Sequence, residues 1–202
     1  MKLSAYNVLS SLLHGFVLLY VVFRIFDIAI ENNAILFYTA IAYILGFFIN
    51  ALGSWLEPLY FLCWGGKPSN KLLDKAQGRF IFGRLYQADI IKTRLIKDAG
   101  NYMQINSDCL FSIAKRKAGE TNRITDLNGM YAFSRGLITM SFILSGLFIS
   151  RFYAYWWCYI ICAVTIIIVN IRCCQFAYYY AKEVYTTYLT IQESQSKIKS
   201  VR

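Results

Sequence analysis

The residues of this sequence best suited to metal binding or nucleophilic chemistry are six cysteines and one histidine. Cys158 and Cys162 are one helical turn apart, but neither a histidine nor a third cysteine accompanies them, which argues against a zinc site. No catalytic triad can be assembled around His14. We therefore expect no enzyme activity, no metal and no cofactor, and cysteines that stay reduced and pack as small apolar residues.

A face of small and polar residues recurs every three or four positions along the second long apolar segment. Small residues let membrane helices approach closely, and asparagine can hydrogen-bond across such a contact. One interpretation is tight packing within the chain; the other is a water-filled path between subunits, lined by this face and by two serines of the third segment. Four helices enclose too little space for an ion path, so the second interpretation requires a homo-oligomer. The residues are Ala42, Gly46, Asn50, Gly53 and Ser54, with Ser141 and Ser145 from the third segment.

Cationic and aromatic side chains alternate in the middle of the chain. This combination suits nucleotides or single-stranded nucleic acid, and a positive surface also suits anionic lipid headgroups. The candidate ligand-binding residues are Arg79, Phe80, Arg84, Tyr86, Lys115, Arg116, Lys117 and Arg123. A further cation, Arg135, interrupts the third apolar segment, and we expect it either to snorkel to the inner headgroups or to ring a cytoplasmic vestibule in an oligomer.

The elements that must position these residues are long and apolar. Of 202 residues 57% are apolar, and the mean hydropathy is +0.43, which excludes an ordinary water-soluble class. A bilayer core about 30 Å thick needs roughly 20 apolar helical residues. Four segments reach this length, the third of them interrupted only by Arg135: residues 3–23, 32–56, 127–150 and 152–171. We predict four transmembrane helices.

Charge indicates the orientation of these helices. The chain carries 21 Lys and Arg against 11 Asp and Glu, and the segment between the second and third helices is strongly basic. By the positive-inside rule this segment and both termini are cytoplasmic, in a multi-pass protein of the inner (plasma) membrane. We predict an all-α membrane protein with four parts: a transmembrane hairpin (1–64), a basic helical cytoplasmic domain (65–128), a second transmembrane hairpin (129–174) and a helical cytoplasmic tail (175–202).

Capping residues and breakers predict the helices of the cytoplasmic part. One helix is expected from about Lys71 to Ala99, ended by Gly100, and a second from about Tyr102 to Lys117. Thr121 or Asn122 is expected to cap a third helix that continues into the membrane. The fourth transmembrane helix is expected to continue through residues 175–192, with tyrosines in an interfacial belt and beyond it: Tyr178, Tyr179, Tyr180, Tyr185 and Tyr188.

This layout resembles the small transmembrane effectors of bacterial anti-phage defence systems, such as the membrane partner in Hailong-type systems or the membrane component of Kiwa. The resemblance rests on four helices, short outer turns, a basic inner domain and no catalytic motif, and it carries over no individual residue. It implies a homo-oligomeric channel or sensor that depolarises or remodels the inner membrane when a cytoplasmic signal changes. It also implies an operon-encoded partner enzyme or a nucleic-acid ligand that acts on the basic domain.

Two functions therefore stand as hypotheses. The first is a homo-oligomeric pore in antiviral defence, with polar faces of the second and third helices along the path and gating through the basic domain. The alternative is a membrane-anchored sensor or adaptor that docks a cytoplasmic partner protein and conducts no ions.

Overall fold

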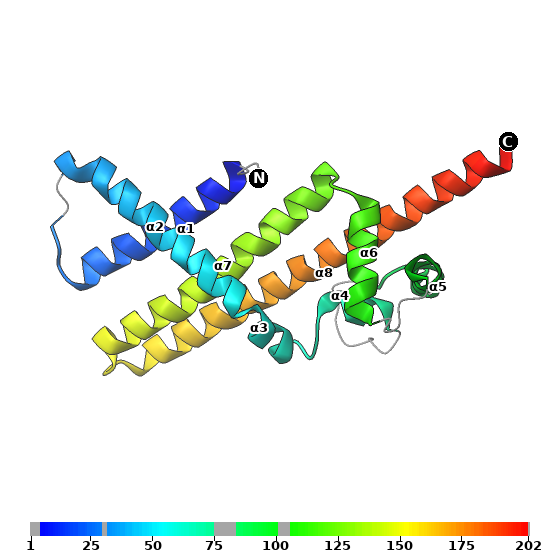
Figure 1. The fold of residues 1–202 in the computed structure, drawn as a ribbon. Helices are drawn as coiled ribbons and strands as arrows, with labels where there is room; N and C mark the ends of the chain where they lie inside the picture. Colours follow the sequence, from blue (N-terminus) through cyan, green and yellow to red (C-terminus); the bar gives the residue numbers. More distant parts are fainter. Residues whose placement is uncertain (1–4, 30–31, 75–83, 101–105, 202) are drawn as a thin grey trace. The chain divides into compact units, whose positions relative to one another are not determined.

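The computed structural model describes residues 5–29, 32–74, 84–100 and 106–201, and all regular structure within these ranges is helical (Figure 1). The elements are α1 (Ala5–Ile25), η1 (Asn32–Ala34), α2 (Ile35–Trp55), α3 (Glu57–Cys63), α4 (Pro68–Leu73), α5 (Ala88–Ala99), α6 (Ser107–Ala118), α7 (Asn122–Phe152) and α8 (Trp156–Val201).

The chain forms two compact units. The apolar unit consists of Met1–Leu59 and Gly129–Cys173, and the basic unit consists of Tyr60–Asn128 and Cys174–Arg202. Helices α7 and α8 each contribute residues to both units. The predicted basic domain and the predicted tail therefore lie in the same unit.

Four helices in the described part of the chain are long and apolar enough to cross a membrane, as the sequence predicts. Large apolar side chains on them are exposed, among them Phe47, Ile161 and Ile168. In water such surfaces would be unfavourable, whereas lipid tails can cover them. The stretches are Val8–Ile25, Ile35–Trp55, Asn122–Phe152 and Trp156–Ser196.

Helices α1 and α2 cross where glycines bring their backbones together (Figure 1). A Cβ atom added to Gly15 would lie 1.6 Å from the carbonyl oxygen of Ala42, and one added to Gly46 would lie 1.7 Å from the carbonyl oxygen of Ser11. Neither position has room for a side chain, and Ala42 is fully buried. The small residues thus set how closely the two helices approach.

Helix α7 completes the core of the apolar unit. Leu18 of α1, Ile49 of α2 and Met140 of α7 are buried together. The helix begins at Asn122 as predicted, because the backbone N–H of Ile124 donates to Thr121 Oγ1 at 3.3 Å. A short turn then reverses the chain, and α8 starts at Trp156 (Figure 1).

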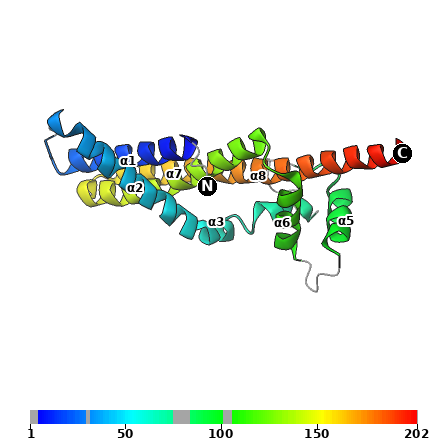
Figure 2. The ribbon, with the colours of Figure 1, turned by 45° about the horizontal axis from the view of Figure 1, so that its top comes forward.

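The C-terminal half of α8 forms the centre of the basic unit. Val184, Tyr185 and Tyr188 are fully buried, and the ring of Phe111 from α6 lies 5.6 Å from that of Tyr185. Helices α5 and α6 lie side by side in this unit (Figure 2). Packing within the unit covers four of the five tyrosines that the sequence places in or beyond an interfacial belt: Tyr178, Tyr180, Tyr185 and Tyr188.

The helix predicted over Lys71–Ala99 is not continuous. Helix α4 ends at Leu73, and Asp74 is extended with φ −97° and ψ 113°. Helix α5 begins only at Ala88, after Gln87 in the left-handed region with φ 59°. Its predicted end is confirmed, because Gly100 follows with φ 60°.

The second predicted helix also starts later than expected. Asn106 is extended, with φ −94° and ψ 151°, so α6 begins at Ser107 and not at Tyr102. The predicted continuation of α8 beyond residue 175 is confirmed, since the helix runs unbroken to Val201.

Candidate functional site

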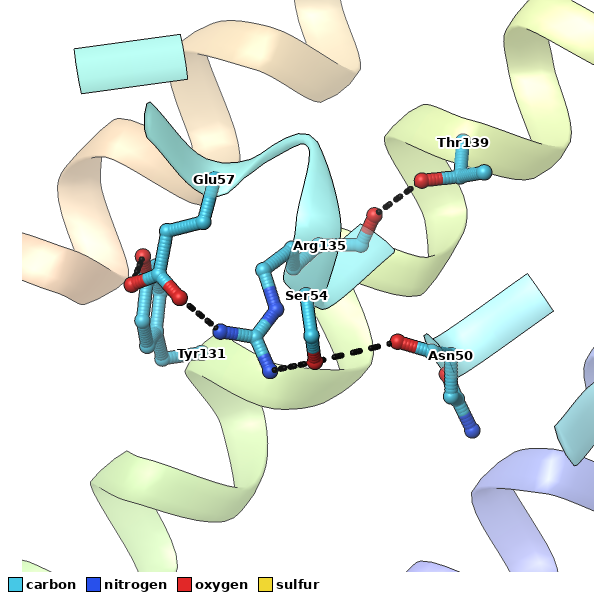
Figure 3. A network of polar contacts seen from close by, with 6 residues as sticks. All are labelled: Asn50, Ser54, Glu57, Tyr131, Arg135 and Thr139. Atoms are coloured by element: carbon cyan, nitrogen blue, oxygen red, sulfur yellow. Dashed lines mark hydrogen bonds and ion pairs between the residues drawn. The ribbon is translucent and has the colours of Figure 1, made fainter. Parts of the chain in front are cut away.

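A cluster of polar side chains joins α2 and α3 to α7 within the apolar unit (Figure 3). Arg135 Nη1 donates to Glu57 Oε2 at 2.5 Å, and Arg135 Nη2 donates to Ser54 Oγ at 2.9 Å. The hydroxyl of Tyr131 donates to the other carboxylate oxygen of Glu57 at 2.7 Å. The guanidinium also lies over the Tyr131 ring, 5.4 Å from its centre. We call Ser54, Glu57, Tyr131 and Arg135 the polar cluster.

Local structure places each member of the polar cluster. Glu57 is the first residue of α3, where a carboxylate interacts favourably with the positive end of the helix dipole. Tyr131 and Arg135 are four residues apart on α7 and so share one face of it. The side chains of Arg135 and Glu57 are 17% and 26% exposed, so the ion pair is mostly shielded from solvent.

Further hydrogen bonds extend from the polar cluster along α2. Ser54 Oγ donates to the backbone oxygen of Asn50 at 3.2 Å, as Figure 3 shows. The amide Nδ2 of Asn50 in turn donates to Ser11 Oγ of α1 at 2.8 Å. Polar contacts therefore run from α7 through α2 to α1.

The structure places most of the predicted small-residue face against other helices of the same chain. Ala42 and Gly46 face α1, and a Cβ atom on Gly53 would lie 3.1 Å from Thr139 Oγ1 of α7. Ser141 and Ser145 are 7% and 9% exposed, and Ser141 Oγ donates to its own helix at Leu137 O.

The structure describes six of the eight predicted ligand-binding residues. Arg79 and Phe80 lie outside the described residues. Arg84 and Tyr86 are exposed just before α5, and Tyr86 is 87% exposed. Two of the predicted cations are paired within the basic unit: Lys117 Nζ lies 2.7 Å from Asp98 Oδ2, and Arg123 Nε lies 3.2 Å from Glu183 Oε2.

The remaining two cations, Lys115 and Arg116, lie in the last turn of α6. Lys115 Nζ lies 5.9 Å from the centre of the Tyr180 ring, and the side chains of Lys115 and Arg116 are both exposed. Lys117 and Arg123 are exposed as well, so all six described members of the predicted ligand-binding set lie on the surface.

Two aspartates of the basic unit have partners that sequence spacing does not reveal. The hydrogen bond from Lys67 at 2.5 Å, with help from Asn70, holds the pKa of the Asp108 carboxyl below its ordinary value against the effect of burial. Burial raises the pKa of Asp98, but hydrogen bonds from Lys117 and from Tyr188 at 2.6 Å outweigh it and lower that pKa. These contacts tie α4 to α6, and α5 to α6 and α8.

The pairing of Glu57 with Arg135 is the main feature of the site that sequence reasoning missed. Neither place expected for Arg135, the headgroups or a vestibule, involved Glu57. The one available signal was that Glu57 directly follows the second apolar segment and that Arg135 is the charged residue within the third. In the described part of the chain, no group of three or more His, Cys, Asp or Glu residues can hold a metal ion.

No protein-family model, curated protein or solved structure matches this chain.

Proposed function

We propose that this chain is a multi-pass protein of the bacterial inner membrane that acts as a homo-oligomeric, pore-type effector. The observation that carries the proposal is the polar cluster. It lies at the C-terminal end of α2, a helix that contains no charged residue. A plain anchor has no need of ionisable groups against apolar helices. Placing an ionisable group inside a membrane costs free energy, so such groups mark ion pathways and gates by default.

The charge distribution supports the orientation in this proposal. The basic segment between α2 and α7 belongs on the cytoplasmic side, and the basic C-terminal end agrees with it. The basic unit then faces the compartment where an intracellular signal arises. Only short connections remain on the outer side.

Within the proposal, the Glu57–Arg135 pair holds α2 to α7 in a closed state. In one chain Ala42, Gly46 and Gly53 of α2 are buried against α1 and α7, so water reaches them only when these helices part. Loss of the ion pair would favour that separation.

Ion flux from liposomes that contain the full chain tests this role. Reversal of either charge, Glu57→Arg or Arg135→Glu, is expected to raise flux at least about tenfold, the equivalent of roughly 1.4 kcal/mol of closed-state stabilisation. The double reversal is expected to restore low flux. Asp74→Asn is the matched control, because it breaks an exposed ion pair to Lys92 that lies outside the polar cluster. Sealed liposomes for every variant would refute conduction.

A nucleotide or single-stranded nucleic acid is the ligand that we propose for the basic unit. The exposed cations of α6 and the exposed Tyr86 support this choice, since cations bind phosphate and aromatic rings stack on bases. Arg116→Glu is expected to weaken binding of a labelled oligonucleotide in fluorescence anisotropy. Lys97→Glu makes the same charge change on α5 and is expected to have less effect. Lack of binding by the unaltered chain would end this part of the proposal.

A non-conducting adaptor is the second candidate, and one observation favours it. Gly46 and Gly53 pack against helices of their own chain, so the small face is satisfied without other subunits. An adaptor would leave liposomes sealed and would form a stoichiometric complex with a cytoplasmic protein, for which the product of a neighbouring gene is the first to test.

A role in antiviral defence completes the proposal and is supported by the layout alone. Expression in a phage-sensitive bacterium is expected to reduce plaque formation, and Glu57→Arg is expected to be toxic without phage. Normal plaque numbers with the chain and its genomic neighbours present would remove this role.

A further inference from the structure

His14 lies buried where three helices of the apolar unit meet. Its side chain is fully buried, and its ring centre lies 4.8 Å from that of Phe133 on α7. A Cβ atom added to Gly136 of α7 would lie 2.8 Å from His14 Cε1 and 2.4 Å from Asn50 Oδ1 of α2. The imidazole is therefore enclosed by α1, α2 and α7 with no space for an added methyl group.

The imidazole is enclosed without hydrogen-bond partners. Among the described residues, neither Nδ1 nor Nε2 has one, and the nearby backbone groups of Ser10 and Phe133 do not meet hydrogen-bond geometry. The neighbouring polar side chains, Asn50 and Ser11, are bonded to each other at 2.8 Å. A buried polar group without a partner is unusual, and it points to a state in which that group is satisfied.

No charged group in the surrounding helices is placed to stabilise an imidazolium. Helix α2 contains no Asp, Glu, Lys or Arg. On α7, Tyr131 and Arg135 are bonded to Glu57, which uses both of its oxygens for them. On α1 itself the charged residue is Arg24, in the last turn. An imidazolium has two N–H donors and a positive charge, so in the closed packing both donors and the charge would lack partners.

We infer that His14 is a proton-binding site that controls the packing of α1 against α2 and α7. Proton uptake at the imidazole favours an opened arrangement in which water or the Asn50 side chain reaches the ring. By linkage, the arrangement that binds the proton better gains stability as the pH falls, so acid opens the contact and neutral pH closes it. The inference concerns packing within one chain and does not require that the protein conducts ions.

Hydrogen–deuterium exchange of the full chain in phosphatidylcholine liposomes tests the inference. After correction for intrinsic exchange rates, backbone amides of residues 8–25 are expected to exchange about tenfold or more faster at pH 5 than at pH 7.5, because a charge without partners disfavours the closed packing. His14→Gln, which remains neutral, is expected to remove this difference. Asp27→Asn, which removes an exposed carboxylate just after α1 and outside the polar cluster, is expected to keep it.

A second measurement uses the unaltered protein and decides the matter if His14→Gln does not fold. Because His14 is the only histidine, ¹⁵N-histidine labelling gives one imidazole whose nitrogen shifts report protonation. Protonation is expected over the same pH range as the loss of amide protection. Equal protection at both pH values, opening with a neutral ring, or a pH effect that disappears in Asp27→Asn and persists in His14→Gln would each overturn the inference. None of these results depends on ion flux.

Discussion

Arg135 donates to the carboxylate of Glu57 at 2.5 Å although 78 residues separate them in the chain. The contact joins the start of α3 to the middle of α7, and Tyr131 occupies the second oxygen of the same carboxylate. The carboxylate therefore has a cationic partner on one oxygen and a neutral donor on the other. Removal of the cation leaves a partly shielded negative charge.

Arg135→Leu is expected to destabilise the apolar unit by about 2 kcal/mol, somewhat less than the 3–5 kcal/mol typical of a broken, fully buried pair, because both side chains keep some exposure. Thermal unfolding in detergent, followed by circular dichroism, measures the loss. Asp74→Asn, which breaks an exposed pair, is expected to cost under about 1 kcal/mol. Equal losses in the two variants would contradict the proposed shielding.

Gly15→Ala is expected to disrupt the crossing of α1 and α2. The new methyl group would lie 1.6 Å from Ala42 O, so the helices must separate, with an expected loss of at least about 1–3 kcal/mol. Gly146→Ala on α7 is the matched control, because a Cβ atom there meets nothing within 4 Å. Unfolding in detergent compares the two. A normal melting temperature for Gly15→Ala would contradict the close approach.

Tyr188→Phe tests the centre of the basic unit. The substitution keeps the buried ring and removes the hydroxyl that donates to Asp98 at 2.6 Å, so a loss of about 1–2 kcal/mol is expected. Tyr179→Phe removes a hydroxyl from an exposed position on the same helix, where the partner is Gln175, and should change stability little. Urea unfolding of the full chain measures both. A larger loss for Tyr179→Phe would contradict the described packing of α8.

The lowered pKa values of Asp98 and Asp108 predict acid sensitivity of the basic unit. A carboxyl whose pKa is lower in the folded state contributes stability above its ordinary pKa of about 3.9, and this stability is lost as the pH falls toward the folded value. Stability is therefore expected to decrease from about pH 4 downward. Lys67→Met removes the hydrogen bond that does most to lower the pKa of Asp108, and it should weaken the dependence of stability on pH. Unfolding curves at pH 6, 4 and 3 give the free energy of unfolding of the unaltered chain and of Lys67→Met. The same decrease with falling pH in both proteins would contradict the prediction.

The long helices could be predicted from the sequence, because charge spacing and helix caps are local signals. The start of α7 depends on Thr121 three positions before Ile124, and the end of α5 depends on Gly100. The break before α5 was missed because Gln87 adopts a left-handed conformation that its residue type does not signal. Local sequence patterns therefore predict helices better than they predict the conformation of the irregular residues between helices.

The partners within the site could not be predicted in the same way. The contact of Glu57 with Arg135 depends on how α2 packs against α7, and no spacing along the chain encodes it. The tyrosines of α8 show the same problem, since an amphipathic ring suits a membrane interface and also a buried core with a partner for its hydroxyl. Ser69 and Asp98, which accept from Tyr185 and Tyr188, are far away in sequence.

The basic unit takes its central tyrosines from the last part of α8, whereas α4, α5 and α6 lie before both later apolar helices. During translation, residues 60–128 leave the ribosome well before residues 174–202 do. The ring of Phe111 on α6 therefore lacks its partners Tyr180 and Tyr185 until the later part of α8 has been synthesised. A chain cut short before residue 174 would lack these tyrosines, so the packing at the centre of the basic unit forms only after α7 and the apolar part of α8 have been made.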